Sequence, residues 1–220
     1  MGTASSTRST QPEQGTALIT GASSGIGATY ADRLAQRGFD LCLVARDQQR
    51  LDALAARLRR QTGRTIRTLR ADLTNRADLL SVAERPCIDG AITMLVNNAG
   101  MMAPGRLLDG DADRLEGMIQ LSVVAATRLA VEAARAFVAR GHGTIINIAS
   151  VLALTPEQLN GGYSGSMAFV LNLTQALQAE AGAAAVLVQA VLPGATRTEL
   201  WDRSGTPIAR LPAEHIDGRG

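Results

Sequence analysis

A glycine-rich stretch near the start of the chain has the residue types and spacing that bind a phosphate. Three glycines follow an apolar run, and a helical pattern begins directly after them. Glycines allow a tight turn and a close approach of the backbone to a ligand, while the free N–H groups of a helix start attract anions. A plain strand-to-helix turn is the alternative, but a long strand–helix alternation follows and favours a dinucleotide site. The expected contacts are Gly21, Ser23, Ser24, Gly25, Ile26 and Gly27.

The residues after the second predicted strand bear on which dinucleotide would bind. The chain reads Val44-Ala45-Arg46-Asp47, where an NAD-specific site would place an acid for the ribose 2′-hydroxyl. Arg46 instead offers a fork of donors suited to a 2′-phosphate. Two alternatives stay open: Asp47 is the ribose acid if the strand ends one residue later, or Arg46 is only a surface residue. We favour NADP(H) over NAD(H).

Apolar runs and amphipathic stretches alternate along the chain and define the fold class. Strands alternating with helices indicate a parallel sheet covered on both faces, and near-continuous apolar strands are typical of such sheets. The sequence therefore predicts an α/β protein with a Rossmann-type doubly wound parallel sheet, whose ligand lies beyond the carboxyl ends of the strands. The predicted strands are 16–20, 40–45, 65–70, 91–97, 143–149 and 185–191, and the predicted helices are 25–37, 47–61, 75–84, 111–140 (as two helices) and 161–182.

Composition excludes several other classes. The chain has 220 residues, 46% of them apolar, and a net charge of +2, which fits one globular domain over 15–220 after a disordered leader at 1–14. No apolar run reaches the roughly 20 residues of a membrane helix, and no apolar signal core is present. Two cysteines, Cys42 and Cys87, indicate reduced thiols in the cytoplasm. All 22 basic residues are arginine, and those between 46 and 76 alternate with acids on a predicted helix, which disfavours nucleic acid.

No metal site is expected. His142 lies in a predicted turn and His215 in the C-terminal tail, and neither has metal-ligand spacing to Cys42 or Cys87.

Four motifs in order resemble the short-chain dehydrogenase/reductase family from about residue 14 to 205. They are Thr20-Gly-x-x-x-Gly-x-Gly27, Asn97-Asn-Ala-Gly100, a spacing of thirteen from Ser150 to Tyr163, and Pro193-Gly-x-x-x-Thr198. The resemblance implies an NAD(P) cofactor lying along the whole site. Beyond the glycine turn and Arg46, the cofactor-binding positions that it implies are Asp72, Leu73, Asn98, Ala99, Gly100, Tyr163, Pro193, Gly194 and Thr198.

The resemblance also implies the chemistry. In the family a hydride moves between nicotinamide and a carbonyl or alcohol carbon, a tyrosine exchanges the proton with the substrate oxygen, and a serine hydrogen-bonds that oxygen. Tyr163 and Ser150 match these two catalytic positions, and a phenol beside a second donor suits such a proton transfer. Family members commonly pair through the long helices that correspond to 111–140 and 161–182, so we expect a homodimer or homotetramer acting on a small-molecule carbonyl or alcohol.

Two catalytic positions depart from the family pattern. The family has Tyr-x-x-x-Lys where this chain has Met167, and an asparagine where it has Ser122; with no lysine in the chain, no other lysine replaces the missing one. On a helix, positions i and i+4 share a face, so Met167 lies where an ammonium would approach the phenol. An unassisted tyrosine has a pKa of about 10 and is only roughly 0.1% ionised at pH 7. A slow reduction is therefore expected and a fast oxidation is not.

Three functions follow as alternatives. The first is an NADP-dependent oxidoreductase that reduces a ketone or aldehyde, with impaired turnover. The second is a catalytically degenerate relative that binds the cofactor or a partner. The third is a truncated, inactive product, since no apolar strand run follows residue 191 and we expect the family's last strand to be missing.

Overall fold

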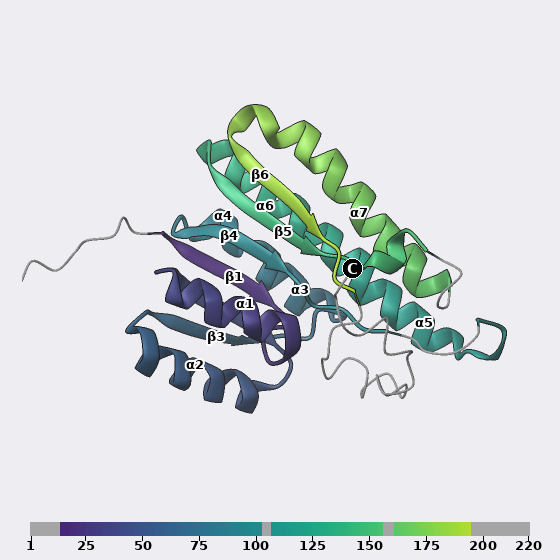
Figure 1. Ribbon diagram of the computed structural model, residues 1–220, viewed down its shortest axis with the longest axis horizontal. Helices are drawn as coiled ribbons and strands as arrows, with labels where there is room; N and C mark the ends of the chain where they lie inside the picture. Colours follow the sequence, from purple (N-terminus) through teal and green to yellow (C-terminus); the bar gives the residue numbers. More distant parts are fainter. Residues whose placement is uncertain (1–13, 103–106, 156–160, 195–220) are drawn as a thin grey trace, which may run out of the picture.

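Six parallel strands form one sheet at the centre of the molecule. The computed structural model describes residues 14–102, 107–155 and 161–194. The strand order is β3-β2-β1-β4-β5-β6 (Figure 1). The order reverses direction between β1 and β4, which is the switch point of a doubly wound sheet. The predicted Rossmann-type fold class is confirmed. The strands are β1 (Thr16–Thr20), β2 (Asp40–Ala45), β3 (Ile66–Arg70), β4 (Ile92–Asn97), β5 (Gly143–Ile148) and β6 (Val186–Val191).

Helices cover both faces of the sheet. The face under α1 and α2 buries side chains such as Leu34, Leu43 and Leu58, and the opposite face buries Leu95, Phe137 and others against α3, α6 and α7. Apolar burial on two faces explains why the strands are nearly continuous apolar runs. The helices are α1 (Gly25–Gln36), α2 (Gln48–Thr62), α3 (Arg76–Ala83), α4 (Arg85–Ile88), α5 (Ala112–Ile119), α6 (Ala126–Arg140) and α7 (Gly161–Ala181).

The segment from 111 to 140 forms the two expected helices, α5 and α6, but their junction was not predicted. A π-helical turn, Gln120–Ala125, joins α5 to α6 without a loop. The sequence there holds neither proline nor glycine that would mark the change. Such turns insert an extra residue into a helix and often occur at functional sites. The short α4, which the apolar pattern did not predict, begins with Pro86 in its first turn.

The described part of the sheet ends at β6. This strand pairs with β5 alone among the residues that the structure describes. The expected loss of the family's last strand concerns the chain after β6, and the expected leader concerns its start; apart from Gln14 and residues 192–194, both lie outside the described residues. Within the described ranges, no helix is long and apolar enough to cross a membrane.

Candidate cofactor and catalytic site

The glycine turn has the tight geometry that the sequence predicted. Gly21 has φ +63°, a conformation that favours glycine, and a Cβ on Gly27 would stand 2.5 Å from the Gly21 carbonyl oxygen. Ser24 precedes α1 in extended backbone, and its side chain makes no capping hydrogen bond. The N-terminus of α1 therefore keeps its dipole and free N–H groups for an anion. Ser23, Ser24, Gly25 and Ile26 are half-buried in this turn.

A hydrogen-bonded latch, which sequence reasoning missed, fixes the turn to β4. The buried Thr20 hydroxyl accepts from the backbone N–H groups of Asn98 and Ala99, both at 3.0 Å. The Asn98 side chain returns the contact by donating to the Thr20 carbonyl at 2.9 Å and to the Gly21 carbonyl at 3.3 Å. Asn98 therefore acts at least in part by holding the glycine turn in place. Thr20 is the first residue of the glycine motif, which was the available signal.

A buried polar network connects the middle of the sheet to the catalytic helices. Asn97 donates to the Ala126 carbonyl at 2.9 Å and to the Asn147 side chain at 3.2 Å, and Asn147 donates to the Thr174 hydroxyl at 3.0 Å. Asn147 and Thr174 are 1% and 2% exposed, so unpaired groups here would be costly. The network ties β4 and β5 to the start of α6 and to α7. A polar residue inside an apolar strand was its only sequence signal.

Arg46 and Asp47, the two candidates for the ribose contact, differ in their local contacts. The Asp47 carboxylate caps α2, accepting from the Arg50 backbone N–H at 3.0 Å, and pairs with the Arg50 guanidinium at 3.3 Å. Its position as N-cap uses the carboxylate for the helix. Arg46 is exposed beside it and has no carboxylate within ion-pair distance among the described residues.

Asp72 lies just after the adjacent strand, β3. Its carboxylate accepts from the Thr74 hydroxyl at 2.7 Å and from the Thr74 backbone N–H at 3.0 Å. Burial alone would raise the pKa of Asp72, but these hydrogen bonds and the positive charges of Arg46 and Arg70 lower it below its ordinary value. Asp72 is therefore ionised at neutral pH. The next residue, Leu73, packs its side chain into the core at 4% exposure, so only its backbone faces this region.

Ser150 and Tyr163 come together at the carboxyl end of β5. Ser150 begins a short 3₁₀ turn, its hydroxyl accepts from the Leu152 N–H at 3.2 Å, and it hydrogen-bonds the Tyr163 side chain. Burial raises the pKa of Tyr163 above its ordinary 10.0, and the hydrogen bond with Ser150 offsets part of that rise. The phenol is therefore protonated throughout the neutral range. The two predicted catalytic side chains form one hydroxyl pair.

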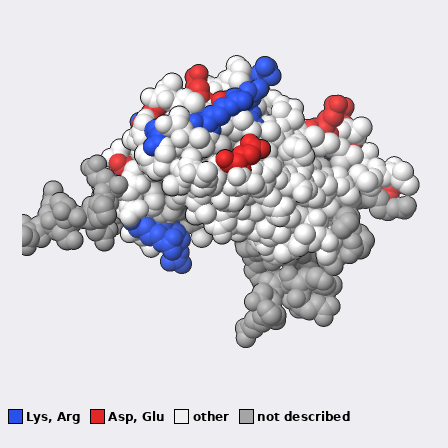
Figure 2. Space-filling model, turned by 90° about the horizontal axis from the view of Figure 1, so that it is seen from above, with Lys and Arg blue, Asp and Glu red and all other residues white. Residues whose placement is uncertain are grey.

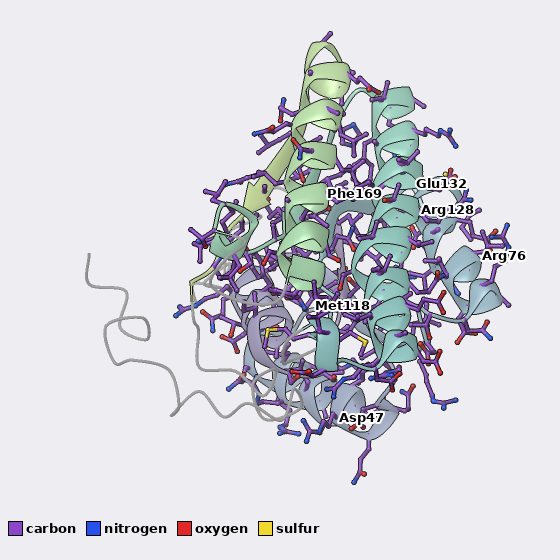
Figure 3. The ribbon with its side chains drawn as sticks, turned by 90° about the vertical axis from the view of Figure 1, so that its right-hand side faces the viewer. Asp47, Arg76, Met118, Arg128, Glu132 and Phe169 are labelled. Atoms are coloured by element: carbon purple, nitrogen blue, oxygen red, sulfur yellow. The ribbon has the colours of Figure 1, made fainter. Side chains whose placement is uncertain are left out.

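An apolar cluster occupies the side of Tyr163 where the resemblance implies a lysine. Met167 lies one helical turn along α7 and is 5% exposed, packed with Tyr163, Met102 and Met118. Figure 3 shows the position of Met118 within the molecule. A thioether carries no charge, so it gives the phenolate no stabilisation, and its apolar neighbours add to the desolvation of the phenol.

Ser122 lies in the π turn, and its hydroxyl is buried. Its Oγ atom has no hydrogen-bond partner among the described residues, and the residue is 2% exposed. The Ser122 Oγ lies near Gly100: a Cβ added to this glycine would be 3.7 Å from the Oγ. A buried hydroxyl without a partner costs roughly 1–3 kcal/mol, which marks this spot as one where a polar group of a ligand or a water would be stabilised.

The remaining predicted positions lie at the carboxyl ends of β4 and β6. Gly100 is exposed, and Ala99 is half-buried against the glycine turn. The Pro193 carbonyl accepts from the Val151 N–H at 3.1 Å, which places Pro193 and Gly194 beside the Ser150 turn. Thr198 and His215 lie outside the described residues. In the part of the chain that is described, no group of three His, Cys, Asp or Glu residues could hold a metal ion.

Comparison with known proteins identifies the family of the chain. The model of the short-chain dehydrogenase family matches residues 15–208. A short-chain dehydrogenase from Sphingobium yanoikuyae, solved in complex with NADPH, is 50% identical with a TM-score of 0.89, covering 92% of this chain and 79% of that one. A bulky-bulky ketone specific alcohol dehydrogenase from Comamonas testosteroni is 45% identical with a TM-score of 0.84, covering 91% and 77%.

Human 17-beta-hydroxysteroid dehydrogenase type 3 is 34% identical over 203 residues, which is 91% of this chain and 65% of the human protein. The chain thus spans about two thirds of that relative's length. With its fold, motifs and paired Ser150 and Tyr163, the chain belongs to the short-chain dehydrogenase/reductase family of NAD(P)-dependent oxidoreductases. The expected family is confirmed.

Proposed function

We propose that this chain reduces a ketone or aldehyde with NADPH, slowly and mainly in the reductive direction. The observation that carries the proposal is a protonated, buried Tyr163 paired with Ser150 at the carboxyl end of β5 and packed in an apolar cluster with Met167. The site residues predicted from the sequence are assigned to this reaction together, over a single domain at 15–220.

The residues present fit a nicotinamide dinucleotide. The tight glycine turn leaves the N-terminus of α1 free for the pyrophosphate, and Arg46 stands at the end of β2 with no carboxylate paired to it among the described residues. The orphan hydroxyl of Ser122 offers one more polar contact beside Gly100. When bound, the reduced cofactor supplies a hydride to the carbonyl carbon.

Tyr163 and Ser150 supply the rest of the reaction. The Ser150 hydroxyl and the phenol both donate to the carbonyl oxygen and stabilise the negative charge that develops on it. As the hydride arrives, the phenolic proton passes to that oxygen and gives the alcohol, and the phenolate then regains a proton from solvent. No step requires the phenol to ionise beforehand. The missing lysine therefore harms this direction less than the reverse one.

Alcohol oxidation requires Tyr163 in its ionised form. The phenolate must be present to accept the alcohol proton, and the raised pKa makes that form scarce at neutral pH. Acid–base groups contribute about 10²–10⁴-fold to rate, which sets the size of the handicap. The parent enzyme is therefore a reductase whose reverse reaction requires alkaline pH.

The surroundings of Tyr163 suit a bulky apolar carbonyl compound. Met101, Leu115, Leu152 and Ala153 pack around the Met102, Met118, Tyr163 and Met167 cluster and extend its apolar surface. The Comamonas relative is named for bulky ketones and the human relative for a hydroxysteroid. We assign this chain to the same chemical class of substrate, a ketone with large apolar groups.

A cofactor-binding protein without turnover is the second candidate. Met167 and Ser122 remove two parts of the family's proton path while leaving the glycine turn and its Thr20–Asn98 latch intact. Under this alternative, NADPH binds and no carbonyl is reduced. The two candidates therefore differ in one measurable step.

We also propose that two copies pair through α6 and α7. These helices lie side by side, with Arg128 and Glu132 on α6 and Phe169 on α7 (Figure 3). A largely apolar groove runs between the π turn, α3, α6 and α7, and Val124 and Phe169 are 44% and 42% exposed. Figure 2 shows a broad uncharged area on one side of the molecule, and Glu180 is the only charged residue of α7. Two-fold pairing buries the same surface of both copies. Light scattering of the parent and of Phe169→Glu tests this pairing. We expect the parent to be a dimer and the Phe169→Glu variant to be a monomer.

The proposed function is tested by two measurements on one sample. Titration with NADPH, followed by cofactor fluorescence, should show saturable binding. Mixing the complex with a panel of aryl and cyclic ketones should then oxidise NADPH in single-turnover experiments. Binding without oxidation of the cofactor by any carbonyl would favour the second candidate. A folded protein that binds neither NADPH nor NADH would exclude both.

A further inference from the structure

The ends of β2 and β3 lie directly side by side. Ala45 is in register with Arg70, and the Ala71 N–H donates to the Ala45 carbonyl at 3.0 Å. The Arg70 Nε then donates to the Arg46 carbonyl at 3.3 Å. Arg70, the last residue of β3, is therefore hydrogen-bonded to Arg46, the residue that the sequence predicts to contact a 2′-phosphate.

Strand alternation places the Arg70 side chain on the face of the sheet where α1 begins. Side chains along a strand point to alternate faces, so Arg70 shares a face with Ile66 and Thr68. Ile66 packs in the cluster under α1 and α2, and the Thr68 hydroxyl donates to Asp52 of α2 at 2.9 Å. The glycine turn is attached at the same place, because the Ala22 N–H donates to the Val44 carbonyl at 3.2 Å.

The charges around the two arginines leave their guanidinium groups open to an anion. Two other arginines, toward the amino ends of β2 and β3, hold carboxylates: Arg64 pairs with Asp40 at 2.9 Å and Arg67 with Asp89 at 2.8 Å. Arg46 and Arg70 are exposed, and neither forms an ion pair with any residue that the structure describes. Two acids lie close by. Asp47 is engaged with α2 and Arg50.

Asp72 is the second of these acids, and its negative charge acts directly against an anion at this place. It is held by Thr74, and its charge interacts with both Arg46 and Arg70. One arginine beside this carboxylate would leave little net positive charge. Two arginines leave an excess, which a phosphate monoester with a charge near −2 would use.

We propose that Arg70 and Arg46 together hold the 2′-phosphate of NADP(H), with Arg70 a specificity-determining residue contributed by β3. The inference rests on the proposed function and extends it, because sequence analysis assigned this contact to Arg46 alone. A guanidinium has five N–H donors in a fixed fork. The Nε of Arg70 is used on the Arg46 carbonyl, which fixes the direction of the fork and leaves its two terminal nitrogens for phosphate oxygens.

The test measures the affinity for two cofactors that differ only in the 2′-phosphate. Calorimetric titration of NADPH and NADH is carried out on the parent, Arg46→Gln, Arg70→Gln and the double variant. Arg60→Gln is the matched control, because Arg60 is an exposed arginine near the far end of α2. We expect Arg70→Gln to weaken NADPH binding about five- to tenfold, a size reduced by solvent screening, and to leave NADH and the control within about twofold.

Further comparisons separate a phosphate contact from a structural role. Arg70→Lys should restore part of the NADPH affinity, because it keeps the charge and loses the fork. Adenosine 2′,5′-bisphosphate should follow the NADPH pattern, and adenosine 5′-monophosphate the NADH pattern. Equal weakening of NADPH and NADH, or unchanged NADPH affinity in Arg70→Gln, would overturn the inference while the proposed function stands. Failure of the folded parent to bind either cofactor would overturn both.

Discussion

The cofactor half and the catalytic half of the site differ in how many of the expected residues they contain. Around β1, β2 and β3, the residues for a dinucleotide are complete, and Thr20 and Asn98 hold the turn with four hydrogen bonds of 2.9–3.3 Å. Around β5 and α7, the hydroxyl pair of Ser150 and Tyr163 is present, but Met167 occupies the position where the resemblance to the family implies a lysine. Under the proposed function, the chain binds the cofactor and transfers a proton only from the protonated phenol of Tyr163.

The largest expected effect lies in the catalytic half. Tyr163→Phe removes the proton donor and keeps the ring that packs against Met167. We expect single-turnover reduction to slow by about 10²–10⁴-fold, with the Kd of NADPH unchanged within about twofold. Reduction that continues at the parent rate would show that the proton comes from elsewhere.

The matching change in the nucleotide half is Gly27→Ala. The added Cβ would lie 2.5 Å from the Gly21 carbonyl and 2.6 Å from the Asn98 amide nitrogen, so the turn and its latch must move. We expect NADPH affinity to fall at least about 30-fold, since several phosphate contacts are lost together. Gly165→Ala is the control, because its Cβ would meet no atom within 4 Å. Calorimetry measures both, and equal affinities for the two variants would contradict the role given to the turn.

Introducing the two residues that the family has at positions 167 and 122 should restore proton transfer in the catalytic half. Met167→Lys with Ser122→Asn places a cation beside the phenol and lowers the pKa of Tyr163. Because a lower pKa supplies more phenolate at a given pH, alcohol oxidation at pH 8 should rise by about tenfold or more. Met167→Leu with Ser122→Asn controls for packing, since leucine is close in volume and uncharged. A pH profile of oxidation that does not move toward neutral pH in the lysine variant, with its thermal unfolding intact, would contradict the role given to Met167.

The smallest effect concerns Asp47. Asp47→Ala removes the cap of α2, which should lower the free energy of unfolding by about 1 kcal/mol. Because that carboxylate is engaged with Arg50, NADH affinity should stay within about twofold of the parent. Chemical denaturation and calorimetry give the two values. A marked loss of NADH binding would make Asp47 the ribose acid after all.

Much of this molecule follows from local sequence patterns, and the exceptions are contacts across the sheet. β2 was predicted at 40–45 and found at Asp40–Ala45, because a buried parallel strand is a continuous apolar run with polar ends. The π turn before α6 was not predicted, since its residues keep a helical pattern without proline or glycine.

Roles that depend on register were also missed. Arg70 is one of nine arginines between 46 and 76, and only its pairing with Ala45 brings it to Arg46. Asn97 and Asn147 are opposite each other on β4 and β5, a fact that the sequence of either strand alone does not contain. The Ser150–Tyr163 pair was found because the resemblance to the family supplied the distant partner.

The most direct test of the central claim is the rate of NADPH oxidation in a single turnover with a bulky aryl ketone, measured from pH 6 to pH 10 on the parent protein. With the pKa of Tyr163 raised above 10.0, the phenol stays protonated over most of this range. We expect a slow first-order oxidation whose rate constant is nearly independent of pH up to about 9. A rate that falls with an apparent pKa between about 6 and 8 would contradict this claim, and so would NADPH that binds but is never oxidised.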